Sequence, residues 1–296
     1  MRDQAQPGVL PLRPLTTGEL LDAAVALIRT RPGLLLGAGF LAALAEQAIL
    51  FPLRRAADVD AAYLPGTGLL EEYGLLIVVS IATEVFCIGL LGGVAAAAAP
   101  RALLGAAAPP RRRSAAGPVV VVALVAAVMC AASGAAFLVL PGPLQLAGLM
   151  LAALATVVVW PFIYGLLGLA APAVVIDQLG PARALLRSLR LSARLVMRAA
   201  WIRVLGYLAW LFIRLALGLG GIAVFELFLD SPSTTVDNLL MGAAWLTVNT
   251  LAYPMLGCLD AALHLEARMR TEGLDIALSR SLRRGVATEA ALAVPR

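Results

Sequence analysis

Long apolar segments separated by short polar ones dominate the sequence. Six of these segments are long enough to cross a hydrocarbon core about 30 Å thick as helices. They lie near residues 33–53, 74–98, 118–140, 146–172, 202–228 and 238–259. The pattern predicts an all-α integral membrane protein in which residues 1–276 form a single six-span helical domain.

The composition agrees with this prediction. Hydrophobic residues make up 61% of the 296-residue chain and charged residues only 14%, whereas soluble domains average about 45–50% apolar and about 25% charged residues. A water-soluble fold is therefore excluded.

Cys87, Cys130 and Cys258 each fall inside an apolar segment and do not have the spacing of metal ligands. They predict neither a disulfide framework nor a metal site.

The charges between the spans predict their orientation. All 23 basic residues are arginines, and most of them lie before the first span, after the second, between the fourth and fifth, and after the last. The other connections are acidic overall or uncharged. Because arginine-rich connections stay in the cytoplasm, we expect both termini on the cytoplasmic side of an inner (cytoplasmic) membrane. The same rule accounts for the net charge of +5 without nucleic-acid binding.

The segment from about residue 16 to residue 30 predicts an amphipathic cytoplasmic helix that leads into the first span. Thr16 and Glu19 have the spacing of a capping box, which marks the start of a helix. Leu20, Ala24 and Leu27 recur on one side of this helix. We expect this side at the acyl boundary of the inner leaflet. Packing on the protein's own bundle is the alternative.

Residues 181–198 predict a second amphipathic helix on the cytoplasmic surface. Its arginines follow one another at steps of three or four residues, which places them on one arc of the helix. They are Arg183, Arg187, Arg190, Arg194 and Arg198. Because like charges at this spacing repel, we expect compensation from outside the helix, by anionic lipid headgroups or by an acidic partner protein. An ordinary positive-inside connection that is helical is the alternative.

A few polar side chains fall at membrane depth, where they are functional candidates by default. They are Glu46, Glu84, Arg214 and Asn249. The simplest arrangement pairs Arg214 with Glu84 or Glu46 inside the bundle, which would fix the neighbouring helices. A water-filled cavity in which Glu84 and Arg214 contact a polar substrate or headgroup is the alternative. Arg203, closer to the end of its span, is expected to extend its guanidinium to the interface.

The sequence offers no set of catalytic residues. A phosphate-binding P-loop, a nucleophile elbow and a zinc-binding H-E-x-x-H helix are all missing. The single histidine, His264, follows Asp260 at the inner end of the last span. We expect His264 to be an interfacial residue rather than a ligand, and we expect neither enzyme activity nor a cofactor.

Three sequence blocks occur in the order of a known family. They are R-P-L-T-T-G-E-L-L-D at 13–22, A-P-A-V-V-I-D at 171–177 with R-S-L-R-L at 187–191, and E-A-R-M-R-T-E-G-L-D-I at 266–276. These blocks resemble the actinobacterial proteins grouped as the glycerophosphoryl diester phosphodiesterase membrane-domain family, whose closing pattern is roughly D-L-R-x-R-x-E-G-x-D-L. The matching closing residues are Arg268, Arg270, Glu272, Gly273 and Asp275.

The resemblance implies a multi-span domain that handles or organises envelope lipids, without the separate phosphodiesterase domain that some members carry. It adds no catalytic residue. Glu266, Ala267 and Leu189 depart from the usual Asp, Leu and Trp of the family. On physical grounds, Gly273 is expected to end the last helix, and residues 277–296 are expected to form a mobile cytoplasmic tail.

These features predict a non-catalytic polytopic protein that acts as a scaffold or as the membrane subunit of an envelope or lipid-handling complex. The expected partners are membrane lipids with anionic headgroups and a protein on the cytoplasmic side, and not nucleic acid. A transporter or permease subunit is the alternative. Such a subunit would need a separate ATPase, because the chain has no ATP-binding motif.

Overall fold

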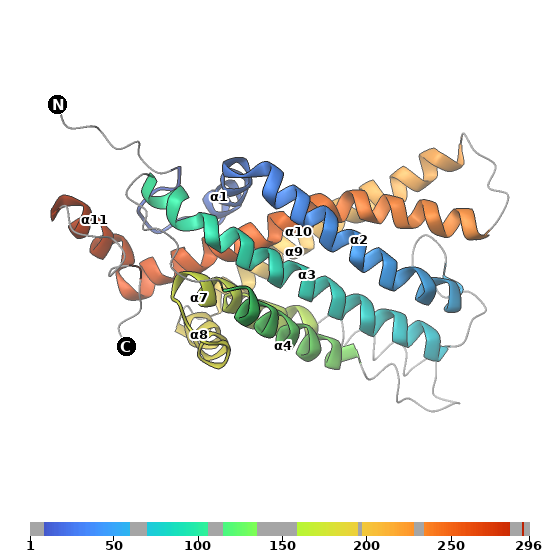
Figure 1. Ribbon diagram of the computed structural model, residues 1–296, viewed down its shortest axis with the longest axis horizontal. Coiled ribbons are helices and arrows are strands. Elements are labelled where there is room, and N and C mark those ends of the chain that lie inside the picture. Colours follow the sequence, from blue (N-terminus) through green and yellow to red (C-terminus); the bar gives the residue numbers. More distant parts are fainter. Residues whose placement is uncertain are drawn as a thin grey trace.

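The computed structural model describes residues 9–59, 70–105, 115–134, 159–194, 197–227, 234–284 and 292. Within these ranges the chain is helical apart from residues 9–16 and short turns, and the long helices run side by side in one bundle (Figure 1). Six helices are long and apolar enough to cross a membrane. The chain is therefore a polytopic all-α membrane protein, as predicted.

Shorter helices lie before, between and after the membrane-spanning ones. α1 (Thr17–Thr30) precedes the spanning helices α2 (Pro32–Ala56), α3 (Leu70–Leu104) and α4 (Ala116–Gly134). The fourth span, Val159–Ile176, contains α7 (Ala170–Ile176), and α8 (Pro181–Arg194) follows it. The chain continues with α9 (Arg198–Glu226), α10 (Thr234–Glu272) and α11 (Leu274–Arg284).

The two longest helices extend beyond the predicted spans. At 1.5 Å per residue, α3 and α10 are about 52 and 58 Å long, well above the hydrocarbon thickness of about 30 Å. Their excess length lies at the end of the bundle where α1, α7, α8 and α11 gather (Figure 1). We call this end the predicted cytoplasmic end. Residues 135–158, which include parts of the third and fourth predicted spans, lie outside the described residues.

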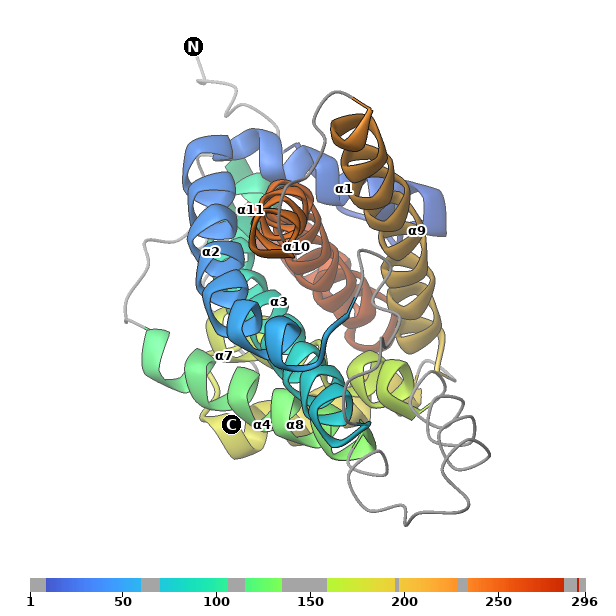
Figure 2. The same cartoon turned by 90° about the vertical axis from the view of Figure 1, so that its right-hand side faces the viewer.

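α10 occupies the centre of the bundle, with α1, α2, α3 and α9 around it (Figure 2). Glycines allow this close packing. A Cβ atom on Gly257 would lie 2.7 Å from the backbone of Leu91 in α3, and one on Gly39 of α2 would lie 2.5 Å from the ring of Pro254. The side chains of α10 therefore face four different helices at once.

α1 has the predicted cap but a different environment. The Thr16 hydroxyl accepts a hydrogen bond from the Glu19 amide, and the Glu19 carboxylate accepts one from the Thr16 amide at 2.8 Å. Leu20, Ala24 and Leu27 are buried in the core shared with α3 and α10. The structure thus places the apolar side of α1 on the protein's own bundle and not at the acyl boundary.

The chain after the last span begins as predicted and then differs. Gly273 has a φ of +64° and ends α10 in the left-handed conformation. Residues 277–284, expected as part of a mobile tail, belong to α11, whose Leu274 and Leu278 are buried. Leu292 is also buried. The rest of the expected tail lies outside the described residues.

Candidate functional site

The four intramembrane candidates lie together inside the bundle. Glu46 comes from α2, Glu84 from α3, Arg214 from α9 and Asn249 from α10, and interactions connect them. Two tyrosines complete the group. We call it the membrane-core cluster, with the members Glu46, Glu84, Tyr207, Arg214, Asn249 and Tyr253.

Arg214 forms an ion pair with Glu84. Its Nη1 lies 2.5 Å from Glu84 Oε1, and the Tyr207 hydroxyl donates a hydrogen bond of 3.1 Å to Glu84 Oε2. Arg214 is only 3% exposed. The predicted pair is present, and it connects α9 to α3. Such a buried pair connects neighbouring helices, and removal of one partner leaves an uncompensated charge.

Glu46 has a different set of partners. The Tyr253 hydroxyl lies 2.7 Å from both carboxylate oxygens, and Asn249 Nδ2 donates a hydrogen bond at 2.9 Å. Gln47 and Thr83 approach at 3.4 and 3.5 Å. All four partners are neutral. Glu46 is thus solvated by polar side chains, and no guanidinium of the described residues contacts it.

Arg203 does not extend to the membrane interface as expected. It is 2% exposed, its Nη2 donates to Asp260 Oδ2 at 2.9 Å, and its guanidinium lies 3.6 Å from the ring centroid of Tyr164. A Cβ atom on Gly168 would collide with this guanidinium. The interfacial prediction is wrong because α10 offers a carboxylate at the same depth and the fourth span leaves room for the side chain.

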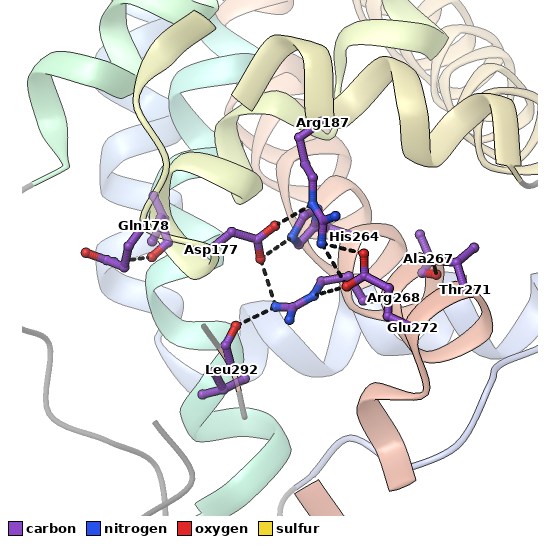
Figure 3. A network of polar contacts seen from close by, with 10 residues as sticks. Asp177, Gln178, Arg187, His264, Ala267, Arg268, Thr271, Glu272 and Leu292 are labelled. Carbon is purple, nitrogen blue, oxygen red and sulfur yellow. Dashed lines mark hydrogen bonds and ion pairs between the residues drawn. The ribbon is translucent and has the colours of Figure 1, made fainter. Parts of the chain in front are cut away.

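A second polar network surrounds Asp177, directly after α7 (Figure 3). His264 Nε2 lies 3.0 Å and Arg268 Nη1 2.8 Å from Asp177 Oδ1, and Arg187 Nε donates to Oδ2 at 3.1 Å. Burial opposes ionisation of Asp177, but His264 and the two arginines hold its pKa below the ordinary value. Asp177 is therefore an ionised acid inside the protein.

Glu272 completes this second network. We call it the inner-end network, with the members Asp177, Arg187, His264, Arg268 and Glu272. Glu272 accepts hydrogen bonds from Arg187 Nη2 at 2.7 Å and from Arg268 Nε at 3.1 Å. Arg268 Nη1 also donates to the carbonyl oxygen of Leu292 at 2.7 Å, as Figure 3 shows. The network thus connects α8, the end of α10 and the C-terminal part of the chain.

His264 and Asp177 had not been expected in such a network. His264 is fully buried, so its expected interfacial position is wrong. A signal in the sequence could have located it: polar residues of α10 recur at steps of four and seven, which places them on one face of the helix. The residues of this face are Asn249, Tyr253, Asp260, His264 and Arg268.

The structure divides the five arginines expected on one arc. α8 ends at Arg194, and Arg198 begins α9 after Met197, whose φ is +63°. Arg198 pairs with Glu266, and Arg187 belongs to the inner-end network. The protein itself therefore compensates two of the five charges. The other three are exposed, namely Arg183, Arg190 and Arg194.

The last of the three sequence blocks, residues 266–276, connects the start of the chain to the bundle. Glu266 forms ion pairs with both Arg198 and Arg270, and these arginines donate to the Leu15 carbonyl at 3.2 and 2.8 Å. Arg268 and Glu272 belong to the inner-end network, and Asp275 lies in the first turn of α11. The residues of this block hold helices together at the predicted cytoplasmic end.

α8 carries a groove of about 360 Å³, which we call the α8 groove. Its described lining combines four arginines with three leucines, namely Arg183, Arg187, Arg190, Arg194, Leu179, Leu186 and Leu191. Guanidinium groups bind phosphate through strong, charge-assisted hydrogen bonds, and leucines suit hydrocarbon. The groove therefore has the chemistry to take a phospholipid headgroup and the adjoining part of its acyl chains.

Comparisons with known proteins do not decide the function. No family model matches the chain, and neither a curated protein nor a solved structure matches it. The resemblance to the glycerophosphoryl diester phosphodiesterase membrane-domain family stays a prediction. In the described part of the chain, no three histidine, cysteine or acidic side chains are placed to hold a metal ion.

Proposed function

We propose that this protein is a non-catalytic scaffold or membrane subunit of an envelope or lipid-handling complex, and that it binds anionic phospholipid headgroups through α8. The observation that carries the proposal is the α8 groove, in which arginines and leucines line one hollow of about 360 Å³. A headgroup phosphate offers the oxygen acceptors that clustered guanidinium groups bind.

The exposure of α8 supports this proposal. Arg183, Arg190 and Arg194 are exposed, and Leu186 and Leu189 beside them are 51% and 38% exposed. Exposed apolar side chains next to arginines are typical of helices at the membrane interface. Each arginine near an anionic surface contributes about 1 kcal/mol, so three of them supply about 3 kcal/mol.

The pairing of the buried charges favours a scaffold over an enzyme. Arg214 with Glu84 and Arg203 with Asp260 each connect two helices of the bundle. Each pair needs both of its partners, because a single buried charge left without its counter-charge is costly. A helical bundle with a basic cytoplasmic face would suit a protein that positions lipids or partner proteins.

The proposal is tested by counting bound lipids. The protein is solubilised in a neutral detergent, anionic phosphatidylglycerol is added, and native mass spectrometry measures the bound lipid. Combined Arg183→Gln, Arg190→Gln and Arg194→Gln substitutions are expected to weaken this binding at least about tenfold. Arg187 is left in place because it belongs to the inner-end network.

A matched control removes the same charge elsewhere. Arg280, Arg283 and Arg284 are three exposed arginines of α11, and their replacement by glutamine is expected to leave lipid binding within about twofold of the wild type. Equal losses in both triple variants would assign the binding to net charge alone. Unchanged binding in the α8 variant would refute the proposal.

The alternative is a transporter or permease subunit that works with a separate ATPase, and the membrane-core cluster is the feature that favours it. This function requires a water-accessible path past Glu84 and Arg214. Single cysteines at Ser80, one turn before Glu84 in α3, and at Thr83, directly before Glu84, can be placed in a background without the three native cysteines. Reaction with a soluble thiol reagent would support transport, whereas protection from both sides would contradict it.

A further inference from the structure

The membrane-core cluster contains two carboxylates but one contacting guanidinium. Glu84 pairs with Arg214 at 2.5 Å, whereas Glu46 contacts only neutral side chains within the described ranges. Glu46 is 3% exposed and lies in a membrane-spanning helix. A carboxylate at this depth without a counter-charge is costly, and binding a proton is the usual way to neutralise it.

The partners of Glu46 suit both protonation states. A tyrosine hydroxyl can donate a hydrogen bond to a carboxylate or accept one from a carboxylic acid. The Tyr253 hydroxyl is 2.7 Å from both oxygens of Glu46, and it also accepts a hydrogen bond from Asn249 at 2.8 Å. A proton can therefore bind to Glu46 and leave it again without leaving a hydrogen-bonding partner unsatisfied.

The other ionisable groups near Glu46 come from α3, α10 and α9. α3 contributes Glu84 and Cys87, whose thiol donates to the Ala42 carbonyl. α10 contributes Tyr253, and Arg214 of α9 lies behind Asn249. α1 joins α2 at Arg31, about 22 Å along the helix from Glu46. Within α2 itself the charged group is Arg54, whose Nη1 donates a hydrogen bond to Gln47 Oε1 at 2.8 Å.

Asn249 places Arg214 within reach of the second carboxylate. Arg214 Nη1 lies 3.5 Å from Asn249 Oδ1, and Nδ2 of the same amide donates to Glu46 at 2.9 Å. One amide group thus separates the guanidinium from Glu46. Arg214 has two alternative carboxylates, Glu84 on α3 and Glu46 on α2.

We propose that Glu46 is a reversible proton-binding site and that its proton decides which carboxylate holds Arg214. With the proton on Glu46, Arg214 pairs with Glu84, as in the structure. When the proton leaves to the aqueous phase, the carboxylate of Glu46 attracts Arg214 past Asn249 and loosens the pair with Glu84. Because Arg214 lies on α9, its shift moves that helix relative to α3. The inference is independent of lipid binding by α8.

Infrared spectroscopy tests the proton directly. The protein is placed in lipid nanodiscs, and spectra are recorded as the pH is raised stepwise. We expect a C=O stretching band of a protonated carboxylic acid that disappears on deprotonation. Glu46→Gln is expected to lack this band, whereas the control Glu72→Gln, at the far end of α3, keeps it. Absence of the band in the wild type, or its presence in Glu46→Gln, would overturn the proposal.

A second variant tests the competition for Arg214 and does not depend on whether Glu46→Gln folds. In Glu84→Gln, Arg214 loses its carboxylate and becomes available to Glu46. We therefore expect the acid band to disappear at a lower pH than in the wild type, by about 1 pH unit or more. An unchanged midpoint would show that Arg214 does not exchange between the two acids, which would refute the switch.

The movement of α9 has its own readout. Spin labels on cysteines introduced at Leu205 of α9 and Leu41 of α2 face outward, because these residues are 55% and 65% exposed. In a background without native cysteines, the distance distribution between the labels is expected to change across the pH range in which the band disappears. The same labels in Glu46→Gln should give no change. A constant distance in the wild type would contradict the coupling to α9.

Discussion

Arg187 of α8 and Glu272 of α10 lie 85 positions apart in the chain and are joined by a hydrogen bond of 2.7 Å between Nη2 and Oε2. The same guanidinium donates to Asp177 and also lines the α8 groove. Arg187 therefore belongs to two features at once. It anchors α8 to α10 and supplies one wall of the proposed lipid site.

We predict that Arg187→Gln and Arg190→Gln differ in their effect on stability. Arg187 has a 15% exposed side chain and two acidic partners, so its removal is expected to cost about 1–3 kcal/mol. Arg190 is exposed, and its removal is expected to change stability by less than about 0.5 kcal/mol. Thermal unfolding of the detergent-solubilised variants measures both. Equal midpoints would mean that Arg187 does not anchor α8.

The buried pair of Arg203 and Asp260 predicts a strong asymmetry between single and double substitutions. Asp260→Asn leaves the Arg203 guanidinium without its counter-charge and is expected to destabilise the protein by about 3–5 kcal/mol. Combining Arg203→Met with Asp260→Leu removes both charges and is expected to restore most of that loss. The midpoints of thermal unfolding compare the variants. A double variant as unstable as Asp260→Asn would contradict the importance of this charge pairing.

The spans and several local features could be predicted because they depend on short stretches of sequence. Hydropathy located six spans, since each needs only a run of apolar residues long enough for the bilayer. The capping box of Thr16 and Glu19 and the helix end at Gly273 are likewise local, and both are confirmed. The intramembrane candidates Glu46 and Arg214 were found because ionisable groups are rare at that depth.

The remaining features depend on which helices are neighbours, and hydropathy does not specify this. Arg203 meets Asp260 only because the fourth span, α9 and α10 converge at that point. His264 is buried because Asp177 faces it from the end of α7. An apolar helix side has the same sequence pattern whether lipid or protein covers it. The packing of α1 on α3 and α10 could therefore not be predicted from the pattern.

Gly257 permits the close approach of α10 and α3. A Cβ atom there would lie 2.7 Å from the Leu91 backbone, so Gly257→Ala is expected to separate the helices and cost about 1–3 kcal/mol. Gly221 of α9 has nothing within 4 Å of such an atom. Gly221→Ala is therefore expected to be neutral or to stabilise the helix by up to about 1 kcal/mol. A tolerated Gly257→Ala would show that the contact can relax.

The start of α1 is predicted to depend on pH through Glu19. A hydrogen bond from Arg13 is the main cause that lowers the pKa of Glu19 from 4.5 to about 2, and hydrogen bonds from Thr16 add to it. Because the pKa is lower in the folded protein, the ionised carboxylate stabilises the helix start above the ordinary value. This contribution is lost as the pH falls from about 4.5 through about 2.

Amide hydrogen exchange measures this loss, because an unravelled first turn exchanges faster. Once the intrinsic pH dependence of exchange is removed, protection of the first turn of α1 is expected to fall across that window in the wild type. In Glu19→Gln the protection should be lower at neutral pH because the ion pair with Arg13 is lost, although glutamine also suits the capping box. The protection should no longer depend on acid, since no carboxylate remains to be protonated. Arg13→Gln is the informative companion. It removes the main cause of the lowered pKa, so the loss of protection should begin at a higher pH than in the wild type. If the Arg13→Gln and wild-type profiles coincided, the exposed pair between Arg13 and Glu19 would contribute nothing to the cap.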